Sequence, residues 1–409
     1  MLIKNINLID GTGNELQKEV DVLIEDNQFK TIGKNLENSN HEIIDGRNKY
    51  LLPGMIDSHV HIMEEMRPLD EKLTTPFSYT FYRAIDHLRR TVNCGITTVR
   101  DALGADQGIK EAVQDGLILG PRMQISINAL TITGGHGDKL TKSGITMPSF
   151  IEDYPGLPTG ICDGVEEVRK KVREMLRAGA DVIKVHATGG VTSPTDHPDF
   201  TQFSIEELKV MVEEAQFRGN RKVMAHAQGL QGVKNCIAAG IHSIEHGIYL
   251  DDEAIESMKN QGIFLVPTLL APVSVIEFAD ELGMSEASIQ KSKEVLDAHT
   301  SSFTKAVNAG VKIAMGTDAG VFKHGTNLRE LALMVEHGMT PMQAIVASTK
   351  VSAECLGYDD EIGTVEAGKK ADFIIVDDNP LNNIGLLKNP NNIKIVSIDG
   401  KIVKNYDEN

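Results

Sequence analysis

Several features that mark specialised protein classes are missing from this 409-residue chain. No stretch reaches the ~18 unbroken apolar residues needed to span a bilayer. The first residues also lack the basic segment and apolar run of a signal peptide. The cysteines are far apart and form no Cys-x-x-Cys pair; they are Cys94, Cys162, Cys236 and Cys355. Reduced, buried thiols and a cytoplasmic location are therefore expected.

Positive charge is also scarce, because 58 acidic residues outweigh 41 lysines and arginines and leave a formal net charge of −17. Such a surface repels phosphate backbones and anionic lipid head groups, so neither nucleic acid nor a membrane is an expected partner. A chain of this length suits one large domain with a smaller accessory domain. The expected partner is a small-molecule or dipeptide substrate, and a homo-oligomeric state is left open.

Both ends of the chain have the pattern of short β-strands separated by turns. Near the N-terminus, strands are expected at Ile3–Ile6, Glu19–Glu25 and Phe29–Ile32. The C-terminal stretch is similar, with strands expected at Ala371–Val376 and Ile393–Ile398. We therefore expect one small β-sandwich domain, built jointly from residues 1–54 and 360–409.

Residues 55–359 change character, because short apolar strands now alternate with helical stretches. The expected strands are Met55–Ile62, Ile96–Asp101, Met123–Leu130, Val182–His186, Lys222–Ala227, Ser243–His246, Ile263–Pro267 and Lys312–Thr317. The expected helices are Tyr79–Asn93, Gly164–Ala178, Ser204–Arg218, Gly229–Ala239, Asp251–Asn260, Ser285–Asn308 and Asn327–His337. Eight strands alternating with helices predict an α/β fold, a (β/α)8 TIM-type barrel. A doubly wound sheet is the alternative, but no Gly-x-Gly-x-x-Gly or P-loop pattern supports it.

Two long connections follow the third and fourth expected strands, at residues 131–163 and 187–203. Long loops inside a compact domain are usually functional. Both would lie at the C-terminal face of the barrel, where barrel enzymes build their active sites.

Polar residues gather at the ends of the expected strands. The strongest local signal is His59-Val60-His61, because residues two apart on a strand point to the same side. Four more such residues follow buried runs: Lys184, His226, His246 and Asp318. Any one of these would be interpreted as a hydrogen-bonded core residue. All six would converge on one face, and burying such a cluster without a metal ion would be costly.

In this order and on these strands, the six residues resemble the binuclear metal site of the amidohydrolase superfamily. The resemblance covers nearly the whole chain, including Leu52-Pro53-Gly54-Met55-Ile56-Asp57 and the closing segment 363–372. Three further motifs resemble the prolidase-like and imidazolonepropionase-like dipeptidase branch: residues 133–137, Gly189-Gly190-Val191 and residues 324–327.

The resemblance implies two divalent metal ions and a modified lysine. A lysine ammonium offers only donors, so Lys184 is implied to carry a carboxyl group on its side-chain nitrogen and to bridge the two ions. His59, His61 and Asp318 are the implied ligands of the more buried ion, and His226 and His246 those of the more exposed one. These ligands suit Zn²⁺, although Mn²⁺, Co²⁺ and Fe²⁺ accept them too.

The implied reaction is amide hydrolysis by a metal-bridging hydroxide that attacks the carbonyl. Asp318 is expected to take the proton of the hydroxide and deliver it to the leaving amine. His136, between glycines in the first long loop, is expected to donate to the scissile carbonyl. The amides of Gly189, Gly190 and Val191 are expected to seat a substrate carboxylate. Gln228, two residues after His226, is expected to contact the substrate.

Several functional alternatives remain within this frame. The leading hypothesis is a dipeptidase or carboxypeptidase for Xaa-Pro or a similar C-terminal residue. The alternative is a hydrolase of another small amide or lactone, such as an N-acyl amino acid or an aromatic amide conjugate. Imidazolonepropionase is disfavoured because it uses one metal and lacks the bridging lysine, and a non-catalytic scaffold because all six ligand positions are filled. Gln228 replaces a tyrosine of some prolidase-like relatives, which leaves the dipeptide preference open.

Other polar residues near the expected site have less defined roles. His186 would face inward, either in the pocket or beside a ligand. His324 would organise the last loop. Glu245 directly precedes His246, and we interpret it as a structural residue that faces away from the barrel axis.

Overall fold

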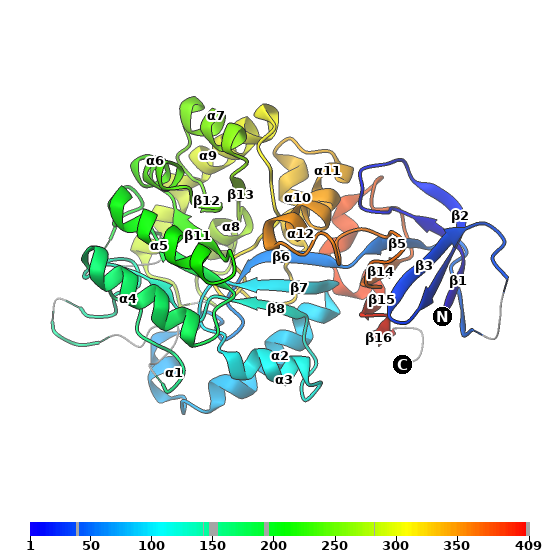
Figure 1. Cartoon of the computed structure of the whole chain (residues 1–409), viewed down its shortest axis with the longest axis horizontal. Coiled ribbons are helices and arrows are strands. Elements are labelled where there is room, and N and C mark those ends of the chain that lie inside the picture. Colours follow the sequence, from blue (N-terminus) through cyan, green and yellow to red (C-terminus); the bar gives the residue numbers. More distant parts are fainter. Residues whose placement is uncertain (38–40, 142, 147–153, 192–195, 282, 406–409) are drawn as a thin grey trace.

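The computed structural model describes residues 1–37, 41–141, 143–146, 154–191, 196–281 and 283–405. A barrel surrounded by helices occupies one end, and a smaller β-sheet region formed by both ends of the chain occupies the other (Figure 1). Parts of the two expected long loops, at 142, 147–153 and 192–195, lie outside the described residues.

The small region is one continuous sheet whose strands come from both ends of the chain. They are β1 (Leu2–Leu8), β2 (Gln17–Glu25), β3 (Gln28–Gly33), β4 (Ile43–Asp45), β5 (Tyr50–Pro53), β14 (Phe373–Val376), β15 (Ile393–Ile398) and β16 (Lys401–Asn405). The hydrogen-bonded order is β16-β15-β14-β5-β1-β2-β3, and β4 pairs with β1 beside this path. Because β5 pairs antiparallel with β14, the two ends of the chain share one sheet.

This sheet curls around a core of its own. Phe29 on β3 and Phe373 on β14 are four places apart in the strand order, yet their ring centroids lie 6.3 Å apart. Buried aliphatic side chains of β1, β2 and β15 fill the space around them. Two layers therefore face each other as in a sandwich, while strand hydrogen bonds join them into a single sheet.

The barrel is built from parallel strands. They are β6 (Met55–Val60), β7 (Ile96–Asp101), β8 (Arg122–Ile125), β9 (Ala129–Leu130), β10 (Val182–His186), β11 (Lys222–Ala227), β12 (Ser243–His246) and β13 (Phe264–Val266). Every neighbouring pair is parallel, which confirms the expected α/β architecture. The third expected strand, Met123–Leu130, is divided into β8 and β9, because Ile127 between them has a left-handed φ of 69°.

The eighth expected strand, Lys312–Thr317, is not a regular strand. It still lies between β13 and β6, because Leu265 forms an isolated bridge with Ile313 and the amide of Ser58 donates to the carbonyl of Met315. Hydrogen bonds to both neighbours thus close the barrel on this side. Regular pairing fails where Gly316 is packed tightly against Val266 of β13.

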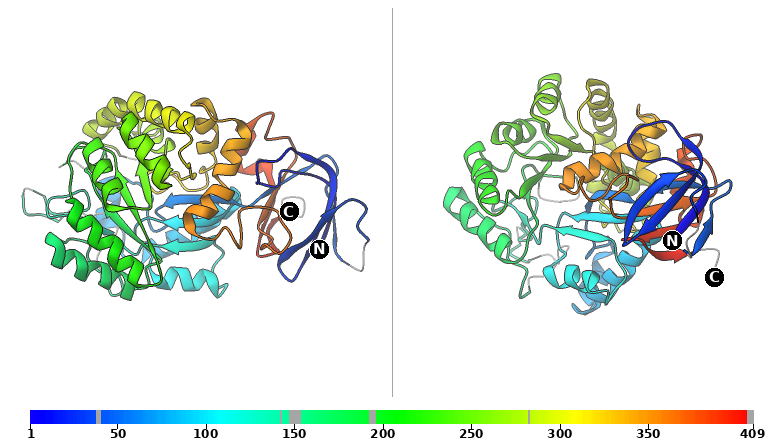
Figure 2. Two further views of the ribbon diagram at one scale, coloured as in Figure 1. Left: turned by 45° about the horizontal axis from the view of Figure 1, so that its top comes forward. Right: turned by 45° about the vertical axis from the view of Figure 1, so that its right-hand side comes forward.

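Helices surround the barrel strands on the outside (Figure 2). The seven expected helices are confirmed to within two residues at each end, as α2 (Tyr79–Asn93), α4 (Gly164–Arg177), α5 (Ile205–Phe217), α6 (Leu230–Ala239), α7 (Asp252–Gln261), α9 (Glu286–Ala309) and α10 (Arg329–Glu336). Several short elements were not expected from the sequence: α1 (Leu69–Thr74), α3 (Gln107–Gln114), α8 (Leu270–Glu277), α11 (Pro341–Ala347), α12 (Lys350–Leu356), η1 (Ile384–Lys388) and η2 (Pro390–Asn392). Gly240, Gly262 and Gly310 end their helices with left-handed φ angles, as their positions predict.

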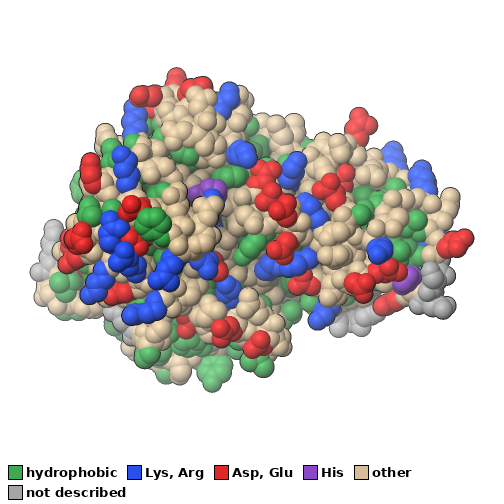
Figure 3. All heavy atoms as spheres, viewed as in Figure 1, with side chains coloured by type: hydrophobic (Ala, Val, Ile, Leu, Met, Phe, Trp, Pro, Cys, Tyr) green, Lys and Arg blue, Asp and Glu red, His purple; other side chains and the backbone are tan. Residues whose placement is uncertain are grey.

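Charge is well distributed over the face of the molecule in Figure 3, where acidic and basic side chains are interspersed on both the barrel and the small sheet. Among the described residues, no helix has both the length and the hydropathy required to cross a bilayer.

Arg122 joins the barrel to the small sheet. It begins β8, and its guanidinium pairs with Asp372, just before β14, and with Asp399, between β15 and β16. The side chain of Asp372 is only 3% exposed, so its carboxylate depends on this cation for compensation.

We predict that Arg122→Ala lowers the free energy of unfolding by about 2–3 kcal/mol, because it leaves the Asp372 carboxylate buried beside no cation. Urea denaturation measures this change. The matched control is Arg47→Ala, because the ion pair of Arg47 with Asp45 is largely exposed and its loss should not be measurable. Equal stability of the two variants would contradict the proposed role of Arg122.

Candidate active site

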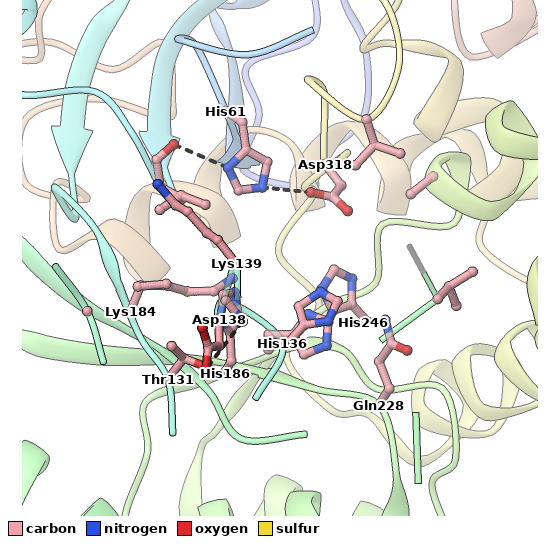
Figure 4. Close-up of a pocket in the computed structure, with 18 of the residues that line it drawn as sticks. His61, Thr131, His136, Asp138, Lys139, Lys184, His186, Gln228, His246 and Asp318 are labelled. Carbon is pink, nitrogen blue, oxygen red and sulfur yellow. Dashed lines mark hydrogen bonds and ion pairs between the residues drawn. The ribbon is translucent and has the colours of Figure 1, made fainter. Parts of the chain in front are cut away.

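A cavity of about 670 Å³ is lined by residues at the carboxyl ends of the barrel strands. All six expected metal ligands line it: His59, His61, Lys184, His226, His246 and Asp318. His136, Val191 and Gln228 line it as well, and Gly190 lies directly against the ring of His136. In Figure 4 the labelled side chains converge on this cavity from opposite sides of the barrel. The structure therefore brings the six candidate ligands together with His136, Gly190, Val191 and Gln228.

The candidate ligands lie within reach of one another. His59, His246 and Asp318 each offer one ligand atom, and these three atoms lie within 4.8 Å of one another. Nε2 of His61 is 2.9 Å from Oδ1 of Asp318, and Nζ of Lys184 is 3.4 Å from Nε2 of His59. The ring of His226 lies 4.6 Å from that of His246, centroid to centroid. The six side chains thus form one continuous cluster.

Each of the four imidazoles in this cluster has one ring nitrogen hydrogen-bonded to a protein oxygen outside the six. The contacts are His59 Nδ1 to Glu245 Oε2 (2.7 Å), His61 Nδ1 to the Leu103 carbonyl (3.3 Å), His226 Nε2 to the Gly189 carbonyl (3.0 Å) and His246 Nδ1 to Thr268 Oγ1 (2.7 Å). Such contacts fix the tautomer and the ring orientation of metal-binding histidines in proteins. The other ring nitrogen of each is then the one available to a metal ion.

Two of the candidate ligands have an unusual backbone conformation. His246 has a φ of 73° and Asp318 a φ of 64°, in the left-handed region that non-glycine residues rarely adopt. Such strain persists where the surrounding structure imposes it, and it concentrates at functional sites. At both positions the left-handed backbone conformation changes the side-chain direction that regular strand alternation would give.

Burial and neighbouring charges shift the ionisable groups in opposite directions. Burial lowers the pKa of Lys184 to about 8, so its amine loses a proton more readily than an ordinary lysine does. Burial alone would raise the pKa of Asp318, but the hydrogen bond from His61 and the charges of His59 and Lys184 bring it down to about 2. Asp318 is therefore a carboxylate at neutral pH.

Asp57 links its own strand, β6, to the segment that contains Asp318. Its Oδ1 accepts from the amides of His59 and Thr317, each at 3.1 Å. Its Oδ2 accepts from the Thr317 hydroxyl at 2.6 Å and from the Asn327 amide at 2.8 Å. The carboxylate is wholly buried, and burial raises its pKa to about 6.

The first long loop places His136 over the cluster. Its ring stacks on that of His226 at 4.6 Å, and its Nδ1 lies 2.8 Å from Oδ2 of Asp196. Gly190 lies directly against the ring, because a Cβ at this position would lie 2.4 Å from Cε1 of His136. A side chain larger than hydrogen at residue 190 would displace the imidazole.

The prediction that backbone amides of Gly189-Gly190-Val191 are available to a substrate carboxylate is wrong for Gly189 and Gly190. The amide of Gly189 donates to the carbonyl of Phe200 at 2.9 Å, and the amide of Gly190 faces Oδ2 of Asp196 at 3.3 Å. These contacts arise because the second long loop folds back on itself, which the sequence did not reveal. Val191 still lines the cavity through its side chain.

Gln228 and His186 are also buried at the cavity. Gln228 is 6% exposed, and its Oε1 has no hydrogen-bond partner among the described residues. His186 packs edge-on against the rings of His136 and His226. His324 lies outside the cavity lining, where its Nε2 meets the carbonyl of Glu64 at 2.8 Å.

The interpretation of Glu245 as facing away from the barrel axis is wrong. Its side chain is fully buried and reaches His59 on β6 and Arg100 on β7, across the barrel interior. His246 leaves the regular strand conformation, so these two consecutive residues both serve the site. Charged residues within two otherwise buried strands, Glu245 and Arg100, were the signal that could have found this pair.

Comparison with known proteins identifies the family. The sequence model of the Amidohydrolase family matches residues 50–403. The chain belongs to the amidohydrolase family. It is a hydrolase of C–N amide bonds, and its fold is the barrel with an additional domain that this family shares.

Relatives within the family place the chain in the prolidase-like branch. An ochratoxinase of Aspergillus niger is 38% identical over 369 residues, covering 87% of this chain and 75% of that protein. A Xaa-Pro dipeptidase solved with bound methionine in its active site is 35% identical, with a TM-score of 0.89 over 98% of this chain and 99% of that one. A prolidase complexed with N-methylphosphonate-L-proline is 31% identical, with a TM-score of 0.90 over 99% of both chains.

Amidohydrolases generally depend on metal ions, and the cluster suits such ions. Four oriented imidazoles, a carboxylate and a lysine of lowered pKa line one cavity. Nitrogen and oxygen ligands of this kind bind Zn²⁺ and related divalent ions.

Proposed function

We propose that this amidohydrolase is a binuclear, zinc-dependent hydrolase of small amides. The leading activity is that of a dipeptidase or carboxypeptidase acting on Xaa-Pro or a similar C-terminal residue. The observation that carries the proposal is the single cluster of six candidate ligands inside a cavity sized for a small molecule. The similarity to a Xaa-Pro dipeptidase and to a prolidase supports the substrate class.

His59, His61 and Asp318 would hold one ion, and His226 and His246 the other. Lys184, carboxylated on Nζ, would hold both. Its lowered pKa supports this modification, because only the neutral amine can add to carbon dioxide. Two bound ions would acidify a water molecule and polarise the scissile carbonyl.

The side chains of the chain perform the remaining steps. Asp318 is ionised, so it can accept a proton from the attacking water and pass it to the leaving amine. With its Nδ1–H donated to Asp196, His136 would donate from Nε2 to the substrate carbonyl in the doubly protonated form of the ring, in which both nitrogens carry hydrogen. The first long loop and α9 line the cavity and separate the reacting groups from bulk water.

The cavity lining favours a substrate with an apolar group and an anionic end. Ile248, Val275 and Val295 form an aliphatic wall. Lys139, on the first long loop, lines the same cavity and is a cationic partner for a substrate carboxylate.

A second candidate is a hydrolase of another small amide, such as an N-acyl amino acid or an aromatic amide conjugate. The similarity to an ochratoxinase favours it. Both candidates require the same metal cluster and differ only in the substrate.

We predict that the purified chain contains two zinc equivalents and that Lys184→Ala loses both activity and metal, since the bridge is removed. A short-chain carboxylic acid should restore part of the activity by filling the vacated space. Elemental analysis and turnover with acetate or propionate check this. Lys110→Ala, which breaks an ion pair with Asp181 outside the cavity, is the control. A fully active Lys184→Ala enzyme would contradict the bridge.

We predict that His136→Ala keeps both metal ions but loses about 2–4 kcal/mol of transition-state stabilisation, the usual contribution of one donor to a developing oxyanion. The loss should appear in kcat more than in KM. His337→Ala removes a histidine outside the cavity and serves as control. Unchanged turnover of His136→Ala would show that His136 does not stabilise the transition state.

Substrate class is tested by comparing dipeptides with their C-terminal amides. We expect kcat/KM to be at least tenfold lower for the amide, because a charge-assisted contact worth about 1.5–3 kcal/mol is lost. Lys139→Gln should remove most of this difference by slowing only the acid. Equal rates for acid and amide in the parent enzyme would favour the second candidate function.

A further inference from the structure

A fully buried chain of charged groups lies directly behind the candidate metal cluster. The side chains of Glu245 and Arg100 are both 0% exposed. Oε2 of Glu245 lies 2.7 Å from Nδ1 of His59. Its Oε1 accepts from Arg100 Nη2 at 3.0 Å and from the Ser243 hydroxyl at 2.6 Å. Every contact is within hydrogen-bond distance.

These charged side chains extend across the barrel interior. Glu245 comes from β12, His59 from β6 and Arg100 from β7. The Nε of Arg100 donates to the carbonyl of Ser58, the residue before His59, at 2.7 Å. Burying a carboxylate and a guanidinium is expensive, so a purely apolar core would be at least as stable. The arrangement therefore calls for a role other than stability.

Glu245 is not itself placed to bind a metal ion. It does not line the cavity, and both of its oxygens are engaged by His59, Arg100 and Ser243. What it contacts is a candidate ligand, on the ring nitrogen opposite the cluster. A neutral imidazole carries one proton, so donation of Nδ1–H to Glu245 leaves the lone pair on Nε2.

We propose that Glu245 is the residue that positions His59 for metal binding, and that Arg100 holds the carboxylate of Glu245 in place. The proposal rests on the proposed metal-dependent function. Glu245 fixes the Nδ1–H tautomer and the ring orientation. Nε2 of His59 thereby points to the centre of the cluster, 3.4 Å from both Lys184 Nζ and Asp318 Oδ1. Arg100 neutralises the pair and holds the backbone of the same strand through Ser58.

The test is zinc affinity, measured by competition with a chelating dye, together with the melting temperature of the metal-free chain. Glu245→Gln should weaken zinc binding about 10–100-fold, the usual effect of losing a partner of a metal-binding histidine. Glu214→Gln is the matched control. Glu214 is also a buried carboxylate with arginine partners, Arg169 and Arg173, but it lies on α5 outside the cavity. Its zinc affinity should equal that of the parent.

A second variant and a measurement on the parent enzyme test the role of Glu245 further. Arg100→Met with Glu245→Leu removes both charges together and should fold, yet bind zinc as weakly as Glu245→Gln. In the metal-free parent, nitrogen-15 NMR of the histidines should find His59 protonated on Nδ1. Parental zinc affinity in either folded variant, or an Nε2–H tautomer of His59, would overturn the proposal.

These readouts separate the inference from the proposed function, because zinc binding needs no substrate. A parent that binds two zinc ions but cleaves no small amide would refute the proposed function and leave the role of Glu245 intact. An active enzyme whose Glu245→Gln variant binds zinc normally would refute only the role of Glu245.

Discussion

The hydrogen bonds of Asp57 hold the candidate site together. One carboxylate, buried between β6 and the irregular segment after α9, accepts from the backbone on both sides. The same segment closes the barrel through backbone hydrogen bonds to β6 and β13 and not through a regular strand ladder; among them, the amide of Asp318 donates to the carbonyl of His59 at 2.8 Å. Asp57 adds its side-chain hydrogen bonds to this pairing and so helps to set where Asp318 lies relative to His59 and His61. The wholly buried position of this carboxylate is the cost of that constraint.

The order and spacing of polar residues at strand ends made much of the site predictable. His59 and His61 share a side because they are two residues apart on a strand, and Lys184, His226 and Asp318 follow apolar runs that had to be buried. All line one cavity. The strands and long helices were predictable from the periodicity of their apolar residues, because their burial patterns are regular.

What the sequence did not reveal depends on backbone conformation and on contacts between distant segments. The left-handed φ of His246 breaks the alternation from which Glu245 was assigned outward. The division of β8 from β9 at Ile127 has the same kind of cause. The amides of Gly189 and Gly190 were expected to be available, but Phe200 and Asp196 fold back onto them. The missed α-helices have six to eight residues, which gives little room for an apolar period, although α10, also of eight residues, was predicted.

The shared sheet at the two chain ends has a consequence for how the protein folds. Leu52 on β5 pairs with Ile374 on β14, so the sheet joins segments separated by the whole barrel. During synthesis, β5 leaves the ribosome with one edge unpaired and must wait for almost the entire chain before its partner arrives. Contacts of such long sequence separation form slowly, and an exposed strand edge invites pairing with other chains. Until β14 emerges, the unpaired edge of β5 is therefore a place where the nascent chain can pair with other chains.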